Sequence, residues 1–224
     1  MIKGANTLYG RVDVRCPITM DILLKLPNAL QFVSNSMYES TVYTAFSLLF
    51  FGLLRVGEVT VSRLSDVRKI IQNTDVTFTP SAREVKIRIR YSKTNQSGKS
   101  FQICIEKADI ATICPVLSLI AFLRIIPQFS GPLLCHLNKM PVTRTQFVST
   151  LHSALRYLRY ESSIYNSHSF RIGYGTHLTI MGFSDDVIRA KGGGHQIHLN
   201  IIFVFNKHTF TLNMAWTLLY HYSS

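Results

Sequence analysis

The stretch Phe50-Phe-Gly-Leu-Leu-Arg-Val-Gly-Glu-Val59 ends the longest apolar run of the chain on a charged pair, Arg55 and Glu58. The run itself, from residue 43 to residue 54, is interrupted by only two hydroxyl side chains. It is shorter than the roughly 20 residues that a membrane-spanning helix needs. We therefore predict a buried helix over 38–54, followed by an arginine and a glutamate that must face either solvent or a site.

Three segments downstream alternate apolar and polar residues, which is the periodicity of a β-strand. They cover residues 76–79, 84–90 and 100–105. Turn-forming residues, Asn95-Gln-Ser-Gly98, lie between the last two segments. We expect one small antiparallel sheet.

Helical patterns surround this predicted sheet. Thr19 can cap a first helix at about 19–34, with Asp21 in its first turn, and Pro27 is expected to break or kink it. After Pro115 the helical patterns cover about 115–126, 143–158, 169–181, which Gly182 ends, and 184–190. The predicted fold class is mostly α with a small antiparallel β-sheet (α+β), in a single domain.

The charge balance points to a polyanionic partner. Lysine and arginine number 24 against 12 aspartates and glutamates, so the formal net charge is +12. Such a charge favours nucleic acid or an acidic membrane surface as partner. Because the basic residues are spread along the chain and do not form one amphipathic helix, we expect a folded surface that binds double-stranded DNA, and no membrane.

The cysteines and histidines offer no clear metal site. The four cysteines lie far apart without a CxxC pair, which argues against a zinc ribbon or a disulfide scaffold and fits a reducing, intracellular location. His168, His177, His195 and His198 leave a metal alternative open, but no cysteine joins them and no HExxH motif occurs. We expect neither a metal nor a cofactor.

Cleaving a DNA strand without a metal requires three kinds of group. Cations must neutralise the charge that grows on the phosphate, a general acid must protonate the leaving oxygen, and a nucleophile must attack. Arginine suits the phosphate because its planar fork donates two parallel hydrogen bonds and keeps its charge.

Three segments of this chain resemble motifs of the tyrosine recombinases, the phage-integrase-like enzymes that break and rejoin DNA. Arg55 with Glu58 resembles the first arginine motif, in which the acid helps to hold the arginine. Arg90-Tyr-Ser-Lys-Thr-Asn-Gln96 is similar to the β-hairpin lysine segment, and His168-Ser-Phe-Arg171 to the HxxR box. The order and gaps are most similar to the recombinases of Crypton and DIRS-type mobile elements, from about residue 1 to residue 194.

The resemblance implies the recombinase catalytic-domain fold and a role for each residue. Arg55 and Arg171 would clamp the scissile phosphate, His168 would hydrogen-bond it, and Lys93 would protonate the leaving 5′ oxygen. A tyrosine would form a 3′ phosphotyrosyl link, so that neither ATP nor a metal is needed. Related enzymes exchange a carboxy-terminal helix between protomers, which implies a homo-oligomer on DNA.

Each motif also has a plainer interpretation when it stands alone. An Arg-x-x-Glu at a helix end is usually a surface ion pair, a hairpin lysine is usually solvated, and HxxR matches one turn of many helices. The combination, in order and with the expected elements between its members, is what favours the recombinase.

The nucleophile is missing from its expected place. The positions that align with the tyrosine of the family are Ile202 and Val204, and neither side chain can attack phosphorus. A frameshift near Lys191 would explain this, because residues 195–204, back-translated and read one base earlier, permit a family-like segment with a tyrosine. Tyr220 and Tyr222 lie too far along the chain to match.

We therefore expect residues 1–15 to be a leader left from the linker to a missing amino-terminal DNA-binding domain. Residues 16–194 would be the catalytic domain, and 195–224 a divergent, frameshifted tail. The predicted function is DNA cleavage and rejoining in integration and recombination, at a nuclear location, in a degenerate copy without its nucleophile. The alternatives are an active enzyme with its tyrosine elsewhere, an inactive DNA-binding relic of a mobile element, and an unrelated basic structural domain.

Overall fold

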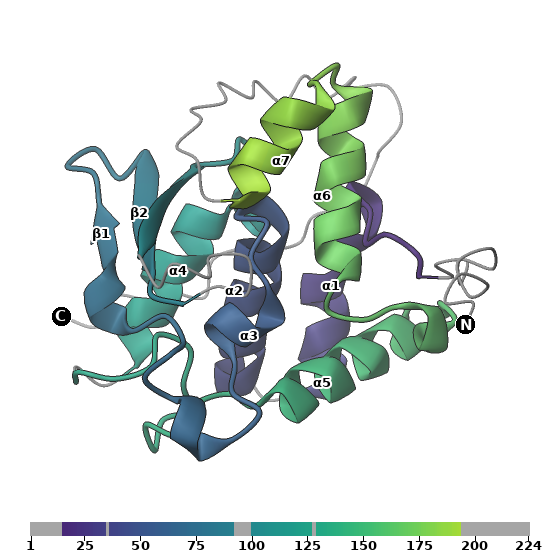
Figure 1. The fold of residues 1–224 in the computed structure, drawn as a ribbon. Helices are drawn as coiled ribbons and strands as arrows, with labels where there is room; N and C mark the ends of the chain where they lie inside the picture. Colours follow the sequence, from purple (N-terminus) through teal and green to yellow (C-terminus); the bar gives the residue numbers. More distant parts are fainter. Residues whose placement is uncertain (1–14, 35, 92–99, 127–128, 194–224) are drawn as a thin grey trace, which may run out of the picture.

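A buried helix forms the centre of the molecule. The computed structural model describes residues 15–34, 36–91, 100–126 and 129–193, and in it α2 (Ser36–Phe51) runs through the middle of the ribbon, with the sheet on one side of it and α6 on the other (Figure 1). Its buried polar residues find partners: Thr41 Oγ1 donates to Met37 O at 3.2 Å, Thr44 Oγ1 donates to Ser40 O at 2.8 Å, and Ser47 Oγ lies 2.8 Å from Ser118 Oγ. Because these hydroxyls are hydrogen-bonded, they interrupt the apolar run without a penalty for burial. The predicted buried helix is confirmed.

Helices from distant parts of the sequence cover α2. α1 (Met20–Val33), α4 (Pro115–Ile125) and α6 (Ser169–Ile180) pack against it, and α5 (Arg144–Tyr157) packs against α1. The ring of Phe46 on α2 lies 5.1 Å from that of Phe147 on α5 and 5.1 Å from that of Phe170 on α6. This aromatic cluster holds the helix that carries the HxxR box against the helix that precedes Arg55.

The sheet is antiparallel, with its strands in the order β1 (Val76–Phe78), β2 (Glu84–Ile89) and β3 (Phe101–Glu106). Ile87 in the middle strand pairs with Ile103 and is buried, whereas its neighbour Arg88 points outward. The predicted strands are therefore confirmed. The turn expected at 95–98 lies outside the described residues.

α1 shows one confirmed and one wrong prediction. Thr19 caps the helix, since its Oγ1 accepts a hydrogen bond from the backbone N–H of Ile22 at 3.3 Å. The expected break at Pro27 does not occur, and α1 continues through this residue. A proline inside a helix costs about 3 kcal/mol, but Leu23 and Leu30 on either side of it are fully buried, and each such side chain contributes roughly 1.5–3 kcal/mol.

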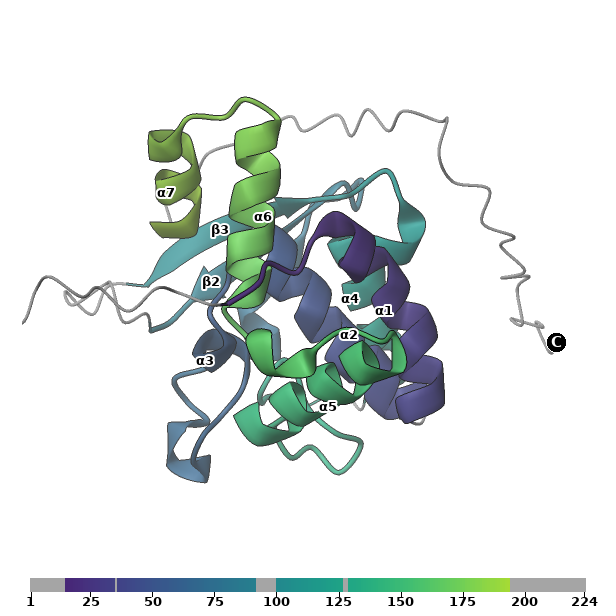
Figure 2. The same cartoon turned by 90° about the vertical axis from the view of Figure 1, so that its right-hand side faces the viewer.

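The carboxyl half of the described chain ends in a helical hairpin. Gly182 ends α6 with a φ of +88°, as predicted, and α7 (Asp185–Gly193) folds back beside α6 (Figure 2). α6 also lies close to the backbone before α1, where the N–H of Ile18 donates to Ser169 O at 2.9 Å. None of the helices in the described ranges is long and apolar enough to cross a membrane. The fold class, mostly α with a small antiparallel sheet, is the predicted one.

Candidate active site

Arg55 enters the site because the chain turns sharply after α2. Gly52 occupies a tight position, where a Cβ would lie 2.7 Å from Leu48 O. The next residue, Leu53, has a φ of +49°, a left-handed conformation that costs a non-glycine residue about 1–2 kcal/mol. This turn leads the chain into the short helix α3 (Val56–Val59), which sequence reasoning did not predict, with Arg55 as its first flanking residue.

Glu58 holds Arg55 in place from within α3. Its carboxylate accepts a hydrogen bond from the backbone N–H of Arg55 at 2.7 Å and one from Arg55 Nη1 at 3.3 Å. Glu58 is only 5% exposed, so this is not the solvated surface pair that an isolated Arg-x-x-Glu would suggest. A charge-assisted contact of this kind restricts the guanidinium to a narrow range of positions.

Arg171 comes from the first turn of α6 and meets the same turn after α2. Its Nη1 donates to the carbonyl oxygen of Leu53, the residue with the strained backbone. Burial lowers the pKa of Arg171, and the nearby charge of Arg55 lowers it further, whereas Glu58 opposes the shift. The two guanidinium groups therefore repel one another, and an anion bound between them would relieve the repulsion.

His168 stands at the amino end of α6, where it flanks the first helical residue. Its backbone N–H donates to Asn166 Oδ1 at 2.8 Å, and Ser169 Oγ accepts from the N–H of Asn166 at 3.0 Å. The side chain of His168 is exposed. The amino end of a helix carries a partial positive charge, so this end of α6 adds to the attraction for an anion.

One cleft of about 450 Å³ brings these side chains together. Arg55, Glu58, His168 and Arg171 all line it. Two arginines and a histidine around a space of this size, next to a helix amino end, can bind a tetrahedral oxyanion such as a phosphodiester. Lys93, the fourth expected site residue, lies outside the described residues.

The cleft also contains residues that sequence reasoning did not single out as site residues. Lys69 in the loop after α3, Tyr91 after β2, Arg144 at the start of α5 and Arg15 before α1 line it as well. Arg15, Lys69 and Arg144 belong to no motif, and Tyr91 lies in the hairpin segment only as a neighbour of Lys93, so no local signal marks these four as site residues. Arg144 and Ser62 also border a second hollow of about 540 Å³, which runs along α5 to His152 and Arg156.

The metal alternative gains no support from the described residues. No three histidine, cysteine, aspartate or glutamate side chains gather there in a way that could hold an ion. His177 lies away from the cleft, stacked on Tyr174 at 6.2 Å between ring centroids, and burial lowers its pKa. His195 and His198 lie outside the described residues.

No protein-family model matches the sequence, and no curated protein matches it either. The structure, however, is similar to solved site-specific recombinases. The XerH recombinase bound to its difH substrate before cleavage matches with a TM-score of 0.58 at 12% identity, over 80% of this chain and 47% of that one. XerH in a post-cleavage complex with a palindromic difH substrate gives a TM-score of 0.59 at 12% identity, over 80% and 46%.

A mutant Flpe in complex with a DNA Holliday junction matches with a TM-score of 0.53 at 16% identity, over 77% of this chain and 42% of that one. The chain thus spans less than half the length of these solved proteins. At such low identity the similarity concerns the fold alone. The described part of the chain has the fold of a tyrosine recombinase catalytic domain.

Proposed function

We propose that this chain is the DNA-binding catalytic domain of a site-specific recombinase or integrase, whose cleft takes the scissile phosphodiester of double-stranded DNA. One observation carries the proposal. Arg55 and the His168–Arg171 turn, more than a hundred residues apart in the sequence, line the same cleft in a fold shared with recombinases. If Arg55–Glu58 were only a surface ion pair and His168–Arg171 only an unrelated helical turn, we would not expect both to line one cleft.

The proposed chemistry distributes charge around one phosphorus atom. Arg55 and Arg171 neutralise the non-bridging oxygens, and His168 donates a further hydrogen bond to them. Lys93 protonates the leaving 5′ oxygen, and a tyrosine hydroxyl forms the bond to phosphorus. The phosphotyrosyl link conserves the energy of the broken ester, so a later attack by a 5′ hydroxyl can rejoin the strand.

The proposal has two forms, an inactive copy and an active enzyme, and they differ in whether the chain has a nucleophilic tyrosine. Ile202 and Val204, where the tyrosine is expected, carry no hydroxyl group. This favours a degenerate copy of a mobile-element recombinase, close to the Crypton and DIRS types, that binds DNA without cutting it. The competing form is an active enzyme whose tyrosine stands elsewhere in the chain.

DNA affinity measured against salt concentration tests the cleft. Each phosphate contact contributes about 0.9 to the slope of log affinity against log salt, or about fivefold in affinity at 0.15 M salt. Arg55→Gln should therefore lower the slope by about 0.9, whereas Arg55→Lys, which keeps the charge but loses the planar fork, should keep the slope and lower the affinity. Arg124→Gln is the control, because Arg124 is exposed on α4 and does not line the cleft.

The proposal fails if Arg55→Gln binds DNA with the slope and affinity of Arg124→Gln, while circular dichroism shows both variants folded. A suicide DNA substrate, which traps the cleaved strand on the protein, then separates the two forms. A covalent adduct identifies an active enzyme, and mass spectrometry of the adduct locates its tyrosine. Salt-sensitive binding without an adduct identifies the inactive form.

A further inference from the structure

The cleft carries more positive charge than one phosphodiester needs. Among the described residues, five arginine and lysine side chains line it against two carboxylates, a formal net charge of +3 with histidine neutral. A phosphodiester carries a single negative charge. Successive phosphates on one DNA strand are spaced by about 3.4 Å along the helix axis, so a cleft of about 450 Å³ has room for more than one of them.

Arg15, Lys69 and Arg144 are the cations among the described residues that line the cleft outside the recombinase motifs, and Lys69 is held by a neighbouring carboxylate. Its ammonium group is hydrogen-bonded to Asp66 Oδ1 at 2.8 Å, and its side chain is 58% exposed. A lysine has three N–H donors, so one contact with Asp66 leaves the group able to donate to an anion as well. The hydrogen bond to Asp66 is also the main cause that raises the pKa of Lys69, which keeps the group charged.

Tyr91 lines the same cleft as Lys69. It follows β2 directly and is 55% exposed, and it is the smallest of the causes that raise the pKa of Lys69. Of the tyrosines in the described ranges, Tyr91 is the one that lines the cleft. A phenol and an ammonium group that line one cleft can both donate hydrogen bonds to a phosphate group.

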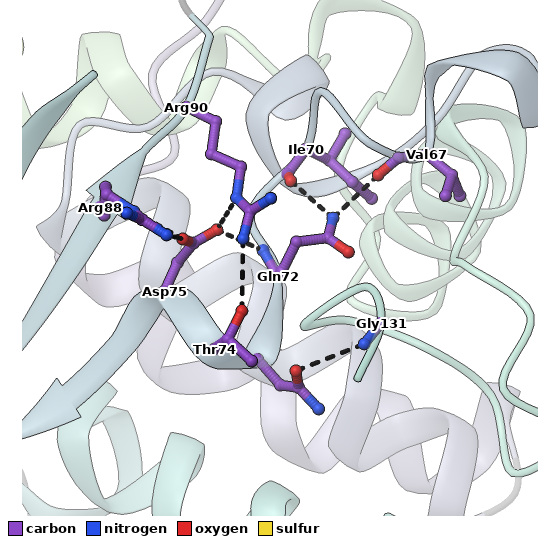
Figure 3. A network of polar contacts seen from close by, with 9 residues as sticks. Val67, Ile70, Gln72, Thr74, Asp75, Arg88, Arg90 and Gly131 are labelled. Atoms are coloured by element: carbon purple, nitrogen blue, oxygen red, sulfur yellow. Dashed lines mark hydrogen bonds and ion pairs between the residues drawn. The ribbon is translucent and has the colours of Figure 1, made fainter. Parts of the chain in front are cut away.

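A network of polar contacts around Gln72 and Asp75 fixes the chain next to Lys69 and Tyr91 (Figure 3). On the loop side, the side-chain amide of Gln72 donates to Val67 O at 2.8 Å and to Ile70 O at 2.7 Å, which closes the turn that carries Lys69. Ile71, between Ile70 and Gln72, donates its N–H to Glu58 O at 2.8 Å. The turn is therefore attached to the helix that holds Arg55.

Asp75 connects this loop to the strand that leads to Tyr91. Its side chain is fully buried and accepts hydrogen bonds from the backbone N–H of Gln72 at 2.9 Å, from Arg88 Nε at 2.8 Å and from Arg90 Nε. Arg90 also donates to Thr74 Oγ1 at 3.2 Å. Because Arg90 immediately precedes Tyr91, one carboxylate connects the backbone segments that carry Lys69 and Tyr91, and neither segment has to be ordered when a ligand binds.

We propose that Lys69 and Tyr91 form a second phosphate subsite, which takes a DNA backbone phosphate next to the one held by Arg55 and Arg171. This inference rests on the proposed function, since it assumes that the cleft binds DNA. It assigns the ligand by its chemistry: a second phosphodiester of the same strand, bound without contact to a base. Asp66 serves to hold Lys69, at the expense of some repulsion of the phosphate.

Salt titrations of DNA binding with the full chain test this subsite. Lys69→Gln should lower the slope of log affinity against log salt by about 0.9 and the affinity at 0.15 M salt about fivefold. Lys25→Gln is a matched control, because Lys25 also pairs with an aspartate, Asp21 at 2.6 Å, and does not line the cleft. Tyr91→Phe removes a neutral donor and should lower the affinity by roughly 3- to 10-fold without a change of slope.

Asp66→Asn distinguishes a ligand subsite from a structural ion pair. If a phosphate binds beside Lys69, removing the carboxylate removes a repulsive charge, and DNA affinity should rise. If Lys69 and Asp66 only stabilise the loop, the affinity should stay the same or fall. A fall or no change would count against the subsite.

Each outcome points to one conclusion. If Arg55→Gln lowers the slope but Lys69→Gln behaves like Lys25→Gln, the second subsite is wrong and the proposed function stands. If neither Arg55→Gln nor Lys69→Gln alters the slope, the proposed function itself fails. Thermal melts of Lys69→Gln should match those of Lys25→Gln, because each lysine forms one partly solvent-exposed ion pair with an aspartate close by in the sequence.

Discussion

Gly173 is the residue on which the placement of α6, and with it His168 and Arg171, depends most directly. A Cβ at this position would lie 1.8 Å from Ile18 O and 2.7 Å from Ile18 C, so the obstacle is backbone and not a flexible side chain. The carbonyl would have to retreat from 1.8 Å to 3.4 Å, the ordinary limit of van der Waals contact. Since Ile18 N is bonded to Ser169 O at 2.9 Å, such a retreat also strains that hydrogen bond.

The expected change in the free energy of unfolding of Gly173→Ala is the sum of two opposing effects. Replacing a helical glycine by alanine gains about 1 kcal/mol of helix propensity, whereas overpacking typically costs about 1–3 kcal/mol. With a backbone clash at the upper end of that range, Gly173→Ala should lose about 2 kcal/mol net, or roughly 4–8 °C in Tm for a chain of this size. Gly175 on the same helix meets nothing nearer than Ile188 at 3.8 Å, so Gly175→Ala should instead raise Tm by roughly 1–4 °C.

Urea and thermal unfolding, followed by circular dichroism at 222 nm as a probe of helix, measure both variants against the unsubstituted chain. The two alanines differ only in what their Cβ meets, so helix propensity cancels between them. A Gly173→Ala protein as stable as Gly175→Ala would refute the close approach of α6 to Ile18. DNA affinity gives a second readout, and it should fall in Gly173→Ala alone, because a displaced α6 moves Arg171.

Two further predictions concern the loop network and the first helix. Burial would raise the pKa of Asp75, but hydrogen bonds from Arg90, the N–H of Gln72 and Arg88 outweigh it, and the pKa lies below its ordinary value of 3.8. The stabilisation of the folded state by ionised Asp75 is therefore present above about pH 4 and is lost as pH falls through the lowered pKa. Urea unfolding midpoints measured between pH 2 and 6 should fall less steeply with acid in Asp75→Asn than in the unsubstituted chain. An equally steep fall in both proteins would contradict this. Thr19→Ala should cost about 1 kcal/mol in urea unfolding while Thr19→Asp keeps the cap, and equal losses in both would argue against the capping hydrogen bond.

The elements of the fold could be predicted from the sequence because their signals are local. Alternation over a few residues marked β2 and β3, a hydroxyl at residue 19 marked the start of α1, and a glycine at 182 marked the end of α6. The apolar run before Arg55 marked the buried helix α2. Capping and strand periodicity depend on residues close together in the sequence, so they can be recognised before any tertiary contact is known.

Other features depend on packing between distant residues. The continuity of α1 through Pro27 is decided by burial of its flanking leucines, which local preference does not register. The short helix α3 and the left-handed Leu53 arise where α2, α6 and the sheet meet.

The sequence by itself determined which side chains are available for phosphate chemistry, and the resemblance of Arg55, Lys93, His168 and Arg171 to a family suggested how they are used. Only the tertiary structure decided that Arg55, His168 and Arg171 line one cleft and that Lys69 and Tyr91 join them. The physical reason is that a phosphate site needs cations from several elements held close despite their repulsion. The contacts that position them, Glu58 with Arg55 and Asp75 with the Arg90 that precedes Tyr91, form only when the chain is folded.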